Sequence, residues 1–199
     1  MRLVACGRSG STGSMPQIDS SGAPPNPLRG LPPIARSDAV ALVLGSMPGT
    51  ASLQAQRYYA HPQNSFWKVF GALVGARPDL GYAERTDALL RARIAVWDVV
   101  QSCDRRGSLD SAIRRASVVP NDFDAFVAAH PQLRLVICNG ATARSFFARY
   151  VVPHASDAVR SLRVVQAPST SPAHASMTIC AKIAAWRGAL VGVVECAAT

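Results

Sequence analysis

The sequence predicts an α/β fold, a three-layer α/β/α sandwich with a four-stranded parallel central sheet. Short runs rich in β-branched and other apolar residues alternate with segments of helical periodicity, an order that is typical of a parallel sheet covered on both faces. Each run is also followed by residues that favour turns and loops. The four expected strands are 40–44, 94–100, 133–138 and 162–166.

Helices are expected between and after these runs. Apolar residues recur at the spacing of one helix face in two places, namely at Phe66, Val69, Phe70 and Leu73 and again at Ile179, Ile183, Trp186 and Leu190. Asn121, with acidic Asp124 three residues later, predicts the start of a helix that continues through Phe126 and Val127. A further helix is expected over about 142–150, after the third strand.

The chain of 199 residues has room for one folded domain. Residues 1–37 are rich in Pro, Gly and Ser and poor in large apolar side chains, so they predict a disordered tail, and the folded domain is expected over 38–199. The sequence shows no apolar run long enough for a signal peptide or a membrane span. We therefore expect a cytoplasmic protein without a membrane partner.

The formal net charge is +9. A positive domain suits a partner with a phosphate backbone, although an Arg-rich composition alone would give the same charge. The five cysteines are an odd number, widely spaced and without a C-x-x-C pair. We expect no disulfide framework, no metal and no cofactor, and the thiols are expected to be buried apolar side chains.

The carboxyl ends of parallel strands share one rim of a sheet. The segments that follow the four expected strands, 45–49, 101–104, 139–142 and 168–174, are rich in Gly, Ser, Asn and Pro. They are therefore expected to meet in one binding crevice. The first segment lacks the residues of a P-loop and the spacing of a dinucleotide-binding loop. It is either a bare turn or a cradle whose backbone N–H groups approach a ligand.

The stretch 45–67 is the most informative part of the chain. It reads G-S-M-P-G-T-A-S-L-Q-A-Q-R-Y-Y-A-H-P-Q-N-S-F-W and resembles the uracil-DNA glycosylase superfamily, most closely its hypoxanthine (deoxyinosine) DNA glycosylase branch. That branch carries G-S-x-P, S-L, a Tyr pair, H-P-x-N and F-W in this order. The W-D at 97–98 and the segment 103–110 also resemble it, and the resemblance covers 38 to about 186.

The resemblance implies a monofunctional DNA glycosylase of base excision repair, which flips a deaminated base out of DNA and hydrolyses its N-glycosidic bond. Hypoxanthine is the base implied first, and uracil in a G/U mismatch is the alternative. The expected partner is DNA, as a duplex or a single strand, bound by a monomer at the nucleoid. Lys68 and Lys182 fall in helical patterns, so no lysine is expected to act as the nucleophile of a lyase step.

Asn64 is the expected catalytic residue. A glycosylase needs a water aimed at the anomeric carbon, and an amide can accept a hydrogen bond from that water and so position it. The resemblance implies that the Asn of H-P-x-N is catalytic in the hypoxanthine branch, whereas other branches use an Asp or Asn at the place held here by Met47. The alternative is that Asn64 only caps the helix that follows it.

The base pocket is expected to combine the glycine loop with aromatic side chains. An aromatic face recovers part of the free energy spent in unstacking a base, although aromatic residues at helical spacing more often pack in a core. The residues expected in this pocket are Gly45, Ser46, Met47, Pro48, Tyr58, Tyr59, Phe66 and Asn139.

The segment 168–174 resembles the superfamily's second motif, a Ser-Pro loop that grips phosphates beside the flipped nucleotide and wedges into the groove. Hydroxyls on a backbone stiffened by proline suit such contacts. The residues expected there are Ser169, Thr170, Ser171, Pro172 and His174. The branch that reads uracil most strictly begins this motif with a His, where this chain has Ser169, so His174 can equally be an ordinary surface side chain.

Two other classes of function stay open. One is a non-catalytic binder of damaged DNA on the same fold, which would release no base. The other is a small-molecule hydrolase, whose binding would lack the steep salt dependence of a protein that neutralises several phosphates.

Overall fold

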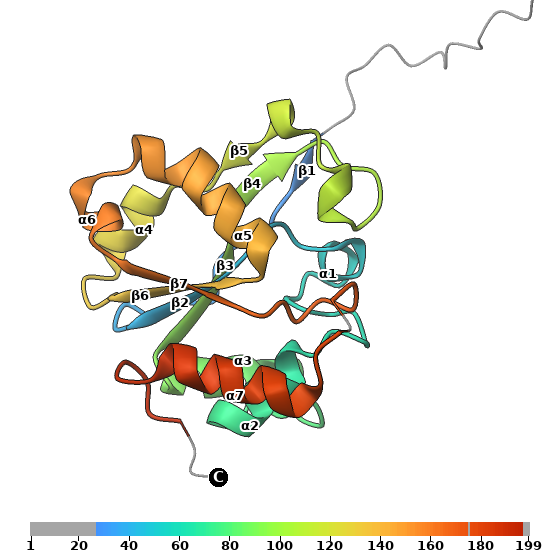
Figure 1. Ribbon diagram of the computed structural model, residues 1–199, viewed down its shortest axis with the longest axis vertical. Helices are drawn as coiled ribbons and strands as arrows, with labels where there is room; N and C mark the ends of the chain where they lie inside the picture. Colours follow the sequence, from blue (N-terminus) through green and yellow to red (C-terminus); the bar gives the residue numbers. More distant parts are fainter. Residues whose placement is uncertain (1–26, 175, 197–199) are drawn as a thin grey trace, which may run out of the picture.

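The computed structural model describes residues 27–174 and 176–196, so the disorder expected for 1–26 lies outside the described residues. Its centre is a four-stranded parallel sheet in the order β3-β2-β6-β7. The strands are β2 (Ala41–Gly45), β3 (Ile94–Asp98), β6 (Leu135–Asn139) and β7 (Arg163–Ala167). Helices cover both faces of this sheet (Figure 1), which confirms the predicted three-layer α/β/α architecture.

The helices of the described chain fall into two layers. On one face lie α2 (Phe66–Val74), α3 (Tyr82–Arg91) and α7 (Ile179–Leu190), and on the other lie α4 (Phe123–Ala129), α5 (Ala141–Phe146) and α6 (Asp157–Arg160) (Figure 1). The short α1 (Thr50–Ala55) follows β2. Helices α2 and α7 meet where the rings of Phe70 and Trp186 pack, with centroids 5.3 Å apart.

The buried face of α7 differs from the predicted one at its first turn. Trp186 and Leu190 are fully buried as expected, but Ile179 is exposed and Lys182 is buried instead. The helix therefore turns a lysine rather than an isoleucine toward the protein at this end.

Strand β2 is buried along its whole length, as an uninterrupted apolar run predicts. Its register places Gly45 opposite Asp98 of β3, and the register of β6 places Asn139 opposite Ala167 of β7. The carboxyl ends of all four strands therefore lie at one rim, which carries the loops that follow them.

The run 94–100 forms two strands rather than one. β3 ends at Asp98, and β4 (Val100–Cys103) belongs to a second, antiparallel sheet in the order β1-β4-β5, with β1 at Leu28–Arg29 and β5 at Val119–Pro120. The N–H groups of Val99 and Val100 still donate to the carbonyls of Gly45 and Ser46, and beyond them the chain pairs with β1 and β5 instead.

Two helix ends also differ from the prediction. The side chain that caps α4 belongs to Asp122, which accepts from the N–H of Ala125 at 2.9 Å, whereas Asn121 donates to the carbonyl of Asp98 at 2.8 Å. The helix expected over 142–150 begins at Ala141 and continues from α5 into a π-helical segment at Phe147–Val151.

The domain boundary expected at 38 is wrong, because residues 27–37 pack on the domain. Leu28 and Arg29 pair with β4, and Ile34 exchanges two backbone hydrogen bonds with Val96. Leu31 is buried. The apolar side chains at 28, 31 and 34 gain enough burial to hold this segment, even though its Pro and Gly content suggested a tail.

Burial of the thiols is only partly as expected. Cys103 and Cys138 are buried, but Cys180 is exposed and Cys196 is half-buried. Among the residues that the structure describes, no helix has the length and apolar character needed to span a bilayer.

Candidate active site

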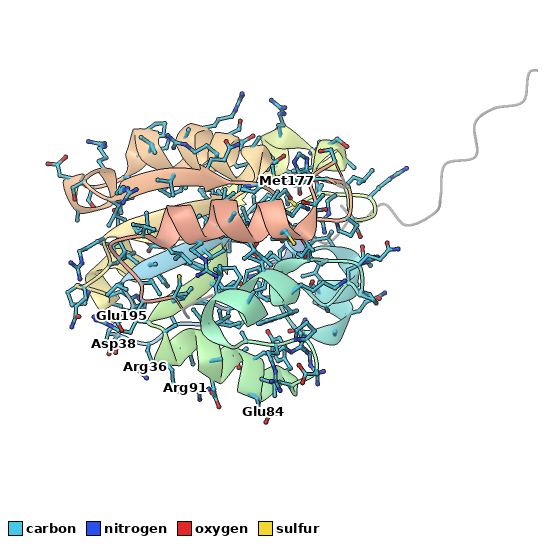
Figure 2. The ribbon with its side chains drawn as sticks, turned by 60° about the horizontal axis from the view of Figure 1, so that its bottom comes forward. Arg36, Asp38, Glu84, Arg91, Met177 and Glu195 are labelled. Carbon is cyan, nitrogen blue, oxygen red and sulfur yellow. The ribbon has the colours of Figure 1, made fainter. Side chains whose placement is uncertain are left out.

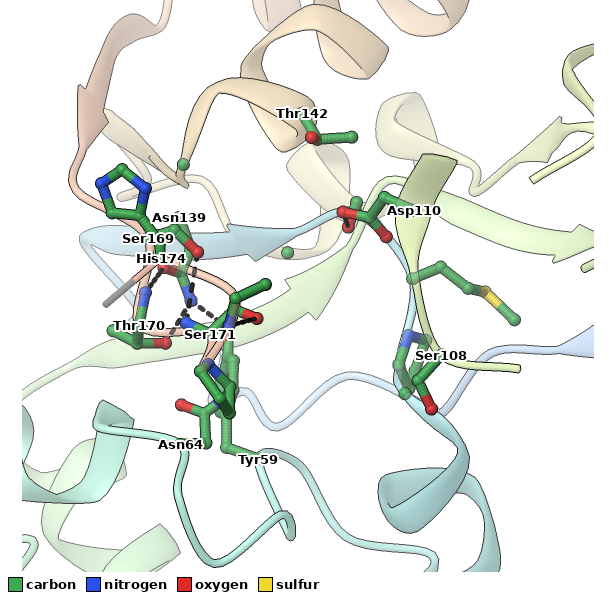
Figure 3. A pocket seen from close by; sticks show the side chains of 18 of the residues that line it. Tyr59, Asn64, Ser108, Asp110, Asn139, Thr142, Ser169, Thr170, Ser171 and His174 are labelled. Carbon is green, nitrogen blue, oxygen red and sulfur yellow. Dashed lines mark hydrogen bonds between the residues drawn. The ribbon is translucent and has the colours of Figure 1, made fainter. Parts of the chain in front are cut away.

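A pocket of about 640 Å³ opens at the carboxyl rim of the sheet. It is lined by the glycine loop 45–49, by 139–142 and by 168–174, as predicted, and also by parts of 58–64 and 108–111. Figure 3 shows Ser108 and Asp110 on one side, facing Tyr59, Asn64 and the other labelled side chains. The predicted segment 101–104 does not line it, because the chain has already turned into β4.

The glycine loop is held in place from the segment 105–110. The guanidinium of Arg105 donates to the carbonyl of Pro48 at 2.5 Å, and the Ser46 hydroxyl donates to a carboxylate oxygen of Asp110 at 2.7 Å. Ser108 accepts from the N–H of Thr50 at 3.0 Å. These contacts fix Gly45, Ser46, Met47 and Pro48 along one wall, which is the position the sequence predicts for them.

Asp98 is a buried carboxylic acid at the floor of this pocket. It is 4% exposed, and its Oδ2 has no hydrogen-bond partner among the described residues. Burial and the nearby Asp110 raise the pKa of Asp98 to about 7, although Arg105 and the neighbouring Tyr58 hydroxyl act in the opposite direction. At the end of a strand, Asp98 could equally form a structural salt bridge to Arg105 or Arg106, but no ion pair of the described chain includes it.

A second carboxylate and a guanidinium complete this cluster. Burial raises the pKa of Asp110, while its hydrogen bond from Ser46 and the charge of Arg105 oppose that rise. Arg105 is buried, and its Nε and Nη1 atoms have no hydrogen-bond partner among the described residues. A buried charge is costly unless it is paired, so the cluster holds both signs of charge beneath the glycine loop.

Asn64 lies in the pocket wall and also caps α2. Its Oδ1 accepts from the N–H of Phe66 at 3.0 Å, and its own N–H donates to the carbonyl of His61 at 2.9 Å. The side chain is half-buried and faces the pocket beside Tyr59 (Figure 3). The two interpretations of Asn64 are therefore compatible, because the capping bond fixes an amide that the pocket can still use.

The aromatic residues occupy different depths. Tyr59 lines the pocket, and its ring stacks on Phe66 with centroids 3.7 Å apart and planes 12° apart. Phe66 itself is fully buried and does not line the pocket, so its placement among the pocket residues is wrong. Tyr58 lines the inner wall while its hydroxyl donates to the carbonyl of Leu31 at 3.2 Å.

Asn139 joins the aromatic side of the pocket to the loop 168–174. Its Nδ2 donates to the Tyr59 hydroxyl at 3.2 Å and to Thr170 Oγ1 at 2.9 Å. Its Oδ1 accepts from the N–H of Thr170 at 2.9 Å. Both amide hydrogens are thus used within the protein, and Asn139 supports the pocket in addition to lining it.

The loop 168–174 is anchored at Thr170. This residue is fully buried, and its carbonyl accepts from the N–H of Ser65 at 2.9 Å and from the Ser65 hydroxyl at 3.1 Å. Because its side chain is fully buried, Thr170 is not the exposed phosphate contact that the sequence predicts. Ser169 and Ser171 are half-buried and line the pocket with Pro172 and His174.

Several residues of the pocket were not selected from the sequence, namely His61, Asp98, Ser108, Asp110 and Thr142. For Asp98 the available signal was its position at the end of a strand, where side chains enter the rim. For Ser108 and Asp110 the available signal was the resemblance of the segment 103–110 to the hypoxanthine branch, but only the fold shows that their loop packs against the glycine loop.

Comparisons with known proteins agree with this geometry. A family model described as Uracil DNA glycosylase superfamily matches residues 32–188. The chain is 35% identical to the hypoxanthine DNA glycosylase of Methanosarcina barkeri over 113 residues, which span 56% of this chain and 70% of that protein. It is also 35% identical to the hypoxanthine DNA glycosylase of Methanosarcina acetivorans over 119 residues, 59% of this chain and 74% of that protein.

A solved structure has the same fold. The solution NMR structure of a candidate uracil DNA glycosylase from Methanosarcina acetivorans superposes with a TM-score of 0.64 at 29% sequence identity. The match covers 80% of this chain and 96% of that chain.

Proposed function

Because this chain belongs to the uracil DNA glycosylase superfamily, we propose that it removes a deaminated base, hypoxanthine first, from DNA. The base is flipped out of the strand into the pocket at the carboxyl rim, and its N-glycosidic bond is hydrolysed to leave an abasic site. Two relatives at 35% identity that carry the name hypoxanthine DNA glycosylase support this choice of base. The volume of the pocket lies in the range of small-molecule sites, roughly 300–1,000 Å³.

The observation that carries the proposal is the placement of Asn64. Its Oδ1 is fixed by the capping bond to Phe66, and a carbonyl oxygen has a second lone pair that can accept from a water. A water held there attacks the anomeric carbon as the base departs. An amide is a weak base, so its contribution is to position the water rather than to take its proton.

Tyr59 provides the stacking surface for the flipped base. One face of its ring is covered by Phe66 and its hydroxyl is held by Asn139, so the ring cannot turn away from the pocket. Stacking on a fixed aromatic ring recovers part of the few kcal/mol that unstacking a base costs.

Asp98 reads the edge of the base. Hypoxanthine presents O6 as an acceptor and N1–H as a donor, and uracil presents O4 and N3–H in the same order. The Oδ2 atom of Asp98 is buried at the pocket wall and has no hydrogen-bond partner among the described residues, so a small shift that opens it to the pocket makes it the acceptor for that N–H. Uracil is therefore the alternative substrate, and pocket depth separates the two bases.

The remaining parts of the proposal concern DNA and the state of the protein. Ser169, Ser171, Pro172 and His174 lie at the pocket edge, where the phosphates beside the flipped nucleotide pass. We expect a monomer that acts on cytoplasmic DNA and makes no contact with membranes. A damaged-DNA binder without activity and a small-molecule hydrolase are the competing classes.

The test uses duplexes that carry one inosine, uracil or xanthine, followed by alkaline cleavage at abasic sites. We expect cleavage of the inosine strand at the lesion and at no other position. Binding without cleavage would identify a damage binder, and the absence of salt-sensitive DNA binding would favour a small-molecule enzyme.

A further inference from the structure

A second groove, of about 400 Å³, lies beside the base pocket and shares the loop 170–174 with it. Its other wall is the segment 62–68, and Lys68 of α2 and Lys182 of α7 both line it. These are the only lysines of the whole chain. The groove has no Asp or Glu among its lining residues, so its charge is positive.

Lys182 is the unusual residue of this groove. It is 4% exposed, and its Nζ donates to the carbonyl of His174 at 2.9 Å. No ion pair of the described chain includes it. An ammonium has three N–H donors, and within the residues that the structure describes this one donates to a single acceptor. Burial lowers the pKa of Lys182, as expected for a charge without an anion beside it.

The burial of Lys182 needs an explanation because a desolvated ammonium is costly unless it is paired. An aliphatic side chain would fill the same place on α7 at no such cost. The protein thus holds a fixed positive charge against the loop that also forms the edge of the base pocket. Lys68, which is exposed, faces the same groove from α2 and can approach an anion bound there.

We propose that this groove binds a backbone phosphate of the damaged strand, next to the flipped nucleotide, with Lys182 as a fixed donor and Lys68 as a mobile one. The proposal rests on the proposed function, since it is the base pocket that brings the strand to the shared loop. A nucleotide held in that pocket stays linked to the neighbouring nucleotides of its strand. The strand therefore passes across the edge of the pocket, which the loop 170–174 forms. Lysine acts as a point charge toward phosphate.

The alternative role for Lys182 is that of a nucleophile. An amine with a lowered pKa can form a Schiff base with the aldehyde of an abasic site. The structure argues against this use. Lys182 lines the second groove and not the base pocket, and its Nζ donates to the carbonyl of His174. Borohydride treatment with abasic DNA distinguishes the two roles, because it reduces an imine to a permanent cross-link.

The test measures DNA binding as a function of salt for Lys182→Gln and Lys68→Gln. Glutamine is one atom shorter than lysine, so Lys182→Gln removes the charge and leaves a neutral N–H donor near the His174 carbonyl. Each lost phosphate contact should lower the slope of log affinity against log salt by about 0.9. Affinity for an inosine duplex should fall by roughly 10-fold for Lys182→Gln, since a hydrogen bond to a charged group is lost, and by less for Lys68→Gln.

The matched control is Arg91→Gln, which removes one positive charge from the end of α3. That end precedes β3 and therefore lies at the opposite rim of the sheet. Figure 2 shows Arg91 well apart from Met177, which lies just before α7. Arg91→Gln should leave the salt slope unchanged.

Duplexes with a single neutral methylphosphonate, moved one position at a time past the lesion, locate the contact. One position should weaken binding by the wild-type protein and have no further effect on Lys182→Gln. Three results would overturn the proposal. They are losses of affinity that add to that of Lys182→Gln at every position, equal salt slopes for Lys182→Gln and Arg91→Gln, and a borohydride cross-link that needs Lys182. If Lys182→Gln does not fold, Lys68→Gln is scanned instead. If the wild-type protein binds DNA but releases no base, the proposed function is wrong, and the measured effect of Lys182→Gln on DNA binding still tests the phosphate site.

Discussion

Gly45 and Asp98 lie opposite each other at the ends of β2 and β3, and Oδ1 of Asp98 occupies the space that a side chain at position 45 would need. The acid can therefore reach the pocket floor only because its neighbour is glycine. The first glycine of the G-S-x-P loop therefore leaves room for a side chain of the neighbouring strand, in addition to beginning its own turn.

Gly45→Ala should displace Asp98, because a Cβ at this position would collide with its carboxylate oxygen. Single-turnover base release should fall by on the order of 10²-fold, and overpacking should lower the free energy of unfolding by about 1–3 kcal/mol. Quenched-flow kinetics and urea unfolding measure the two effects. The control is Gly188→Ala on α7, where a Cβ meets nothing within 4 Å; it should leave the rate unchanged.

Asp98→Asn should stabilise the protein at neutral pH. The pKa of Asp98 is raised from 3.8 to about 7 in the folded state, so the unfolded chain releases this proton first as pH rises. Between these two values the folded state progressively loses stability, up to about 4 kcal/mol at about 1.4 kcal/mol per pKa unit. Asp98→Asn does not lose this stability, because asparagine has no proton to release in this pH range.

Urea unfolding of both proteins at about pH 4 and pH 8 tests this. The advantage of Asp98→Asn should be large at the higher pH and small at the lower one. An equal difference at both pH values would show that Asp98 does not titrate in this range. Base release by the wild-type protein should also rise through pH 7 as the carboxylate forms, and the variant should lack that rise.

Asn64→Ala should reduce single-turnover base release by on the order of 10²-fold or more. It should also cost about 1 kcal/mol of stability, because the N–H of Phe66 loses its acceptor. Asn64→Asp is the matched variant, since it keeps that acceptor and should keep the stability. A folded Asn64→Ala protein with the wild-type rate would leave Asn64 as a cap alone.

Removal of residues 1–37 should destabilise the domain. The shortened chain would lose the buried Leu31 and the backbone pairing of Ile34 with Val96. Burial of one large apolar side chain is worth about 1.5–3 kcal/mol, which corresponds to a fall of roughly 3–12 °C in Tm for a chain of this size. Calorimetry of a chain that begins at Pro27 provides the comparison, and equal Tm values for the two would show that 27–37 contributes nothing.

Competition between bases should separate hypoxanthine from adenine. Adenine offers a donor at N6 and an acceptor at N1, so it leaves the acceptor of Asp98 unpaired, and such mismatches discriminate by roughly 10⁴-fold. We expect release of hypoxanthine first, uracil more slowly or not at all, and no adenine or cytosine. One assay with all four bases in matched duplexes measures this order. Faster release of uracil would reassign the substrate, and release of adenine would contradict the edge-reading role of Asp98.

The sheet could be predicted because its information is local. The apolar run before Gly45 is continuous, and the i, i+3, i+4 spacing around Phe70 is that of one helix face. The split of the run 94–100 could not be predicted, because it depends on the pairing of β4 with β1 and β5, two short segments that lie elsewhere in the chain. The packing of Leu31 was missed for a related reason, since Pro and Gly around it describe the backbone and not the surface that receives the side chain.

The residues of the site also divide into those that a local motif identifies and those that only the fold brings to the pocket. Asn64 and Tyr59 stand in one contiguous motif, so a pattern of residue types was enough to select them. Asp98 and Asp110 become pocket groups only when β3 and the loop after β4 reach the rim. Thr170 carries the right hydroxyl for a phosphate, but its side chain is fully buried and its Oγ1 accepts from Asn139 inside the protein. Sequence shows which groups are available and does not show which of them are already satisfied.

The bonds of Thr170 join two loops at the edge of the pocket. Its N–H is held by Asn139 and its carbonyl holds Ser65, so two loops separated by 105 residues form one rigid lip. We expect the two loops to move as one unit, so the amide protons of Ser65 and Thr170 should exchange with deuterium at one common rate.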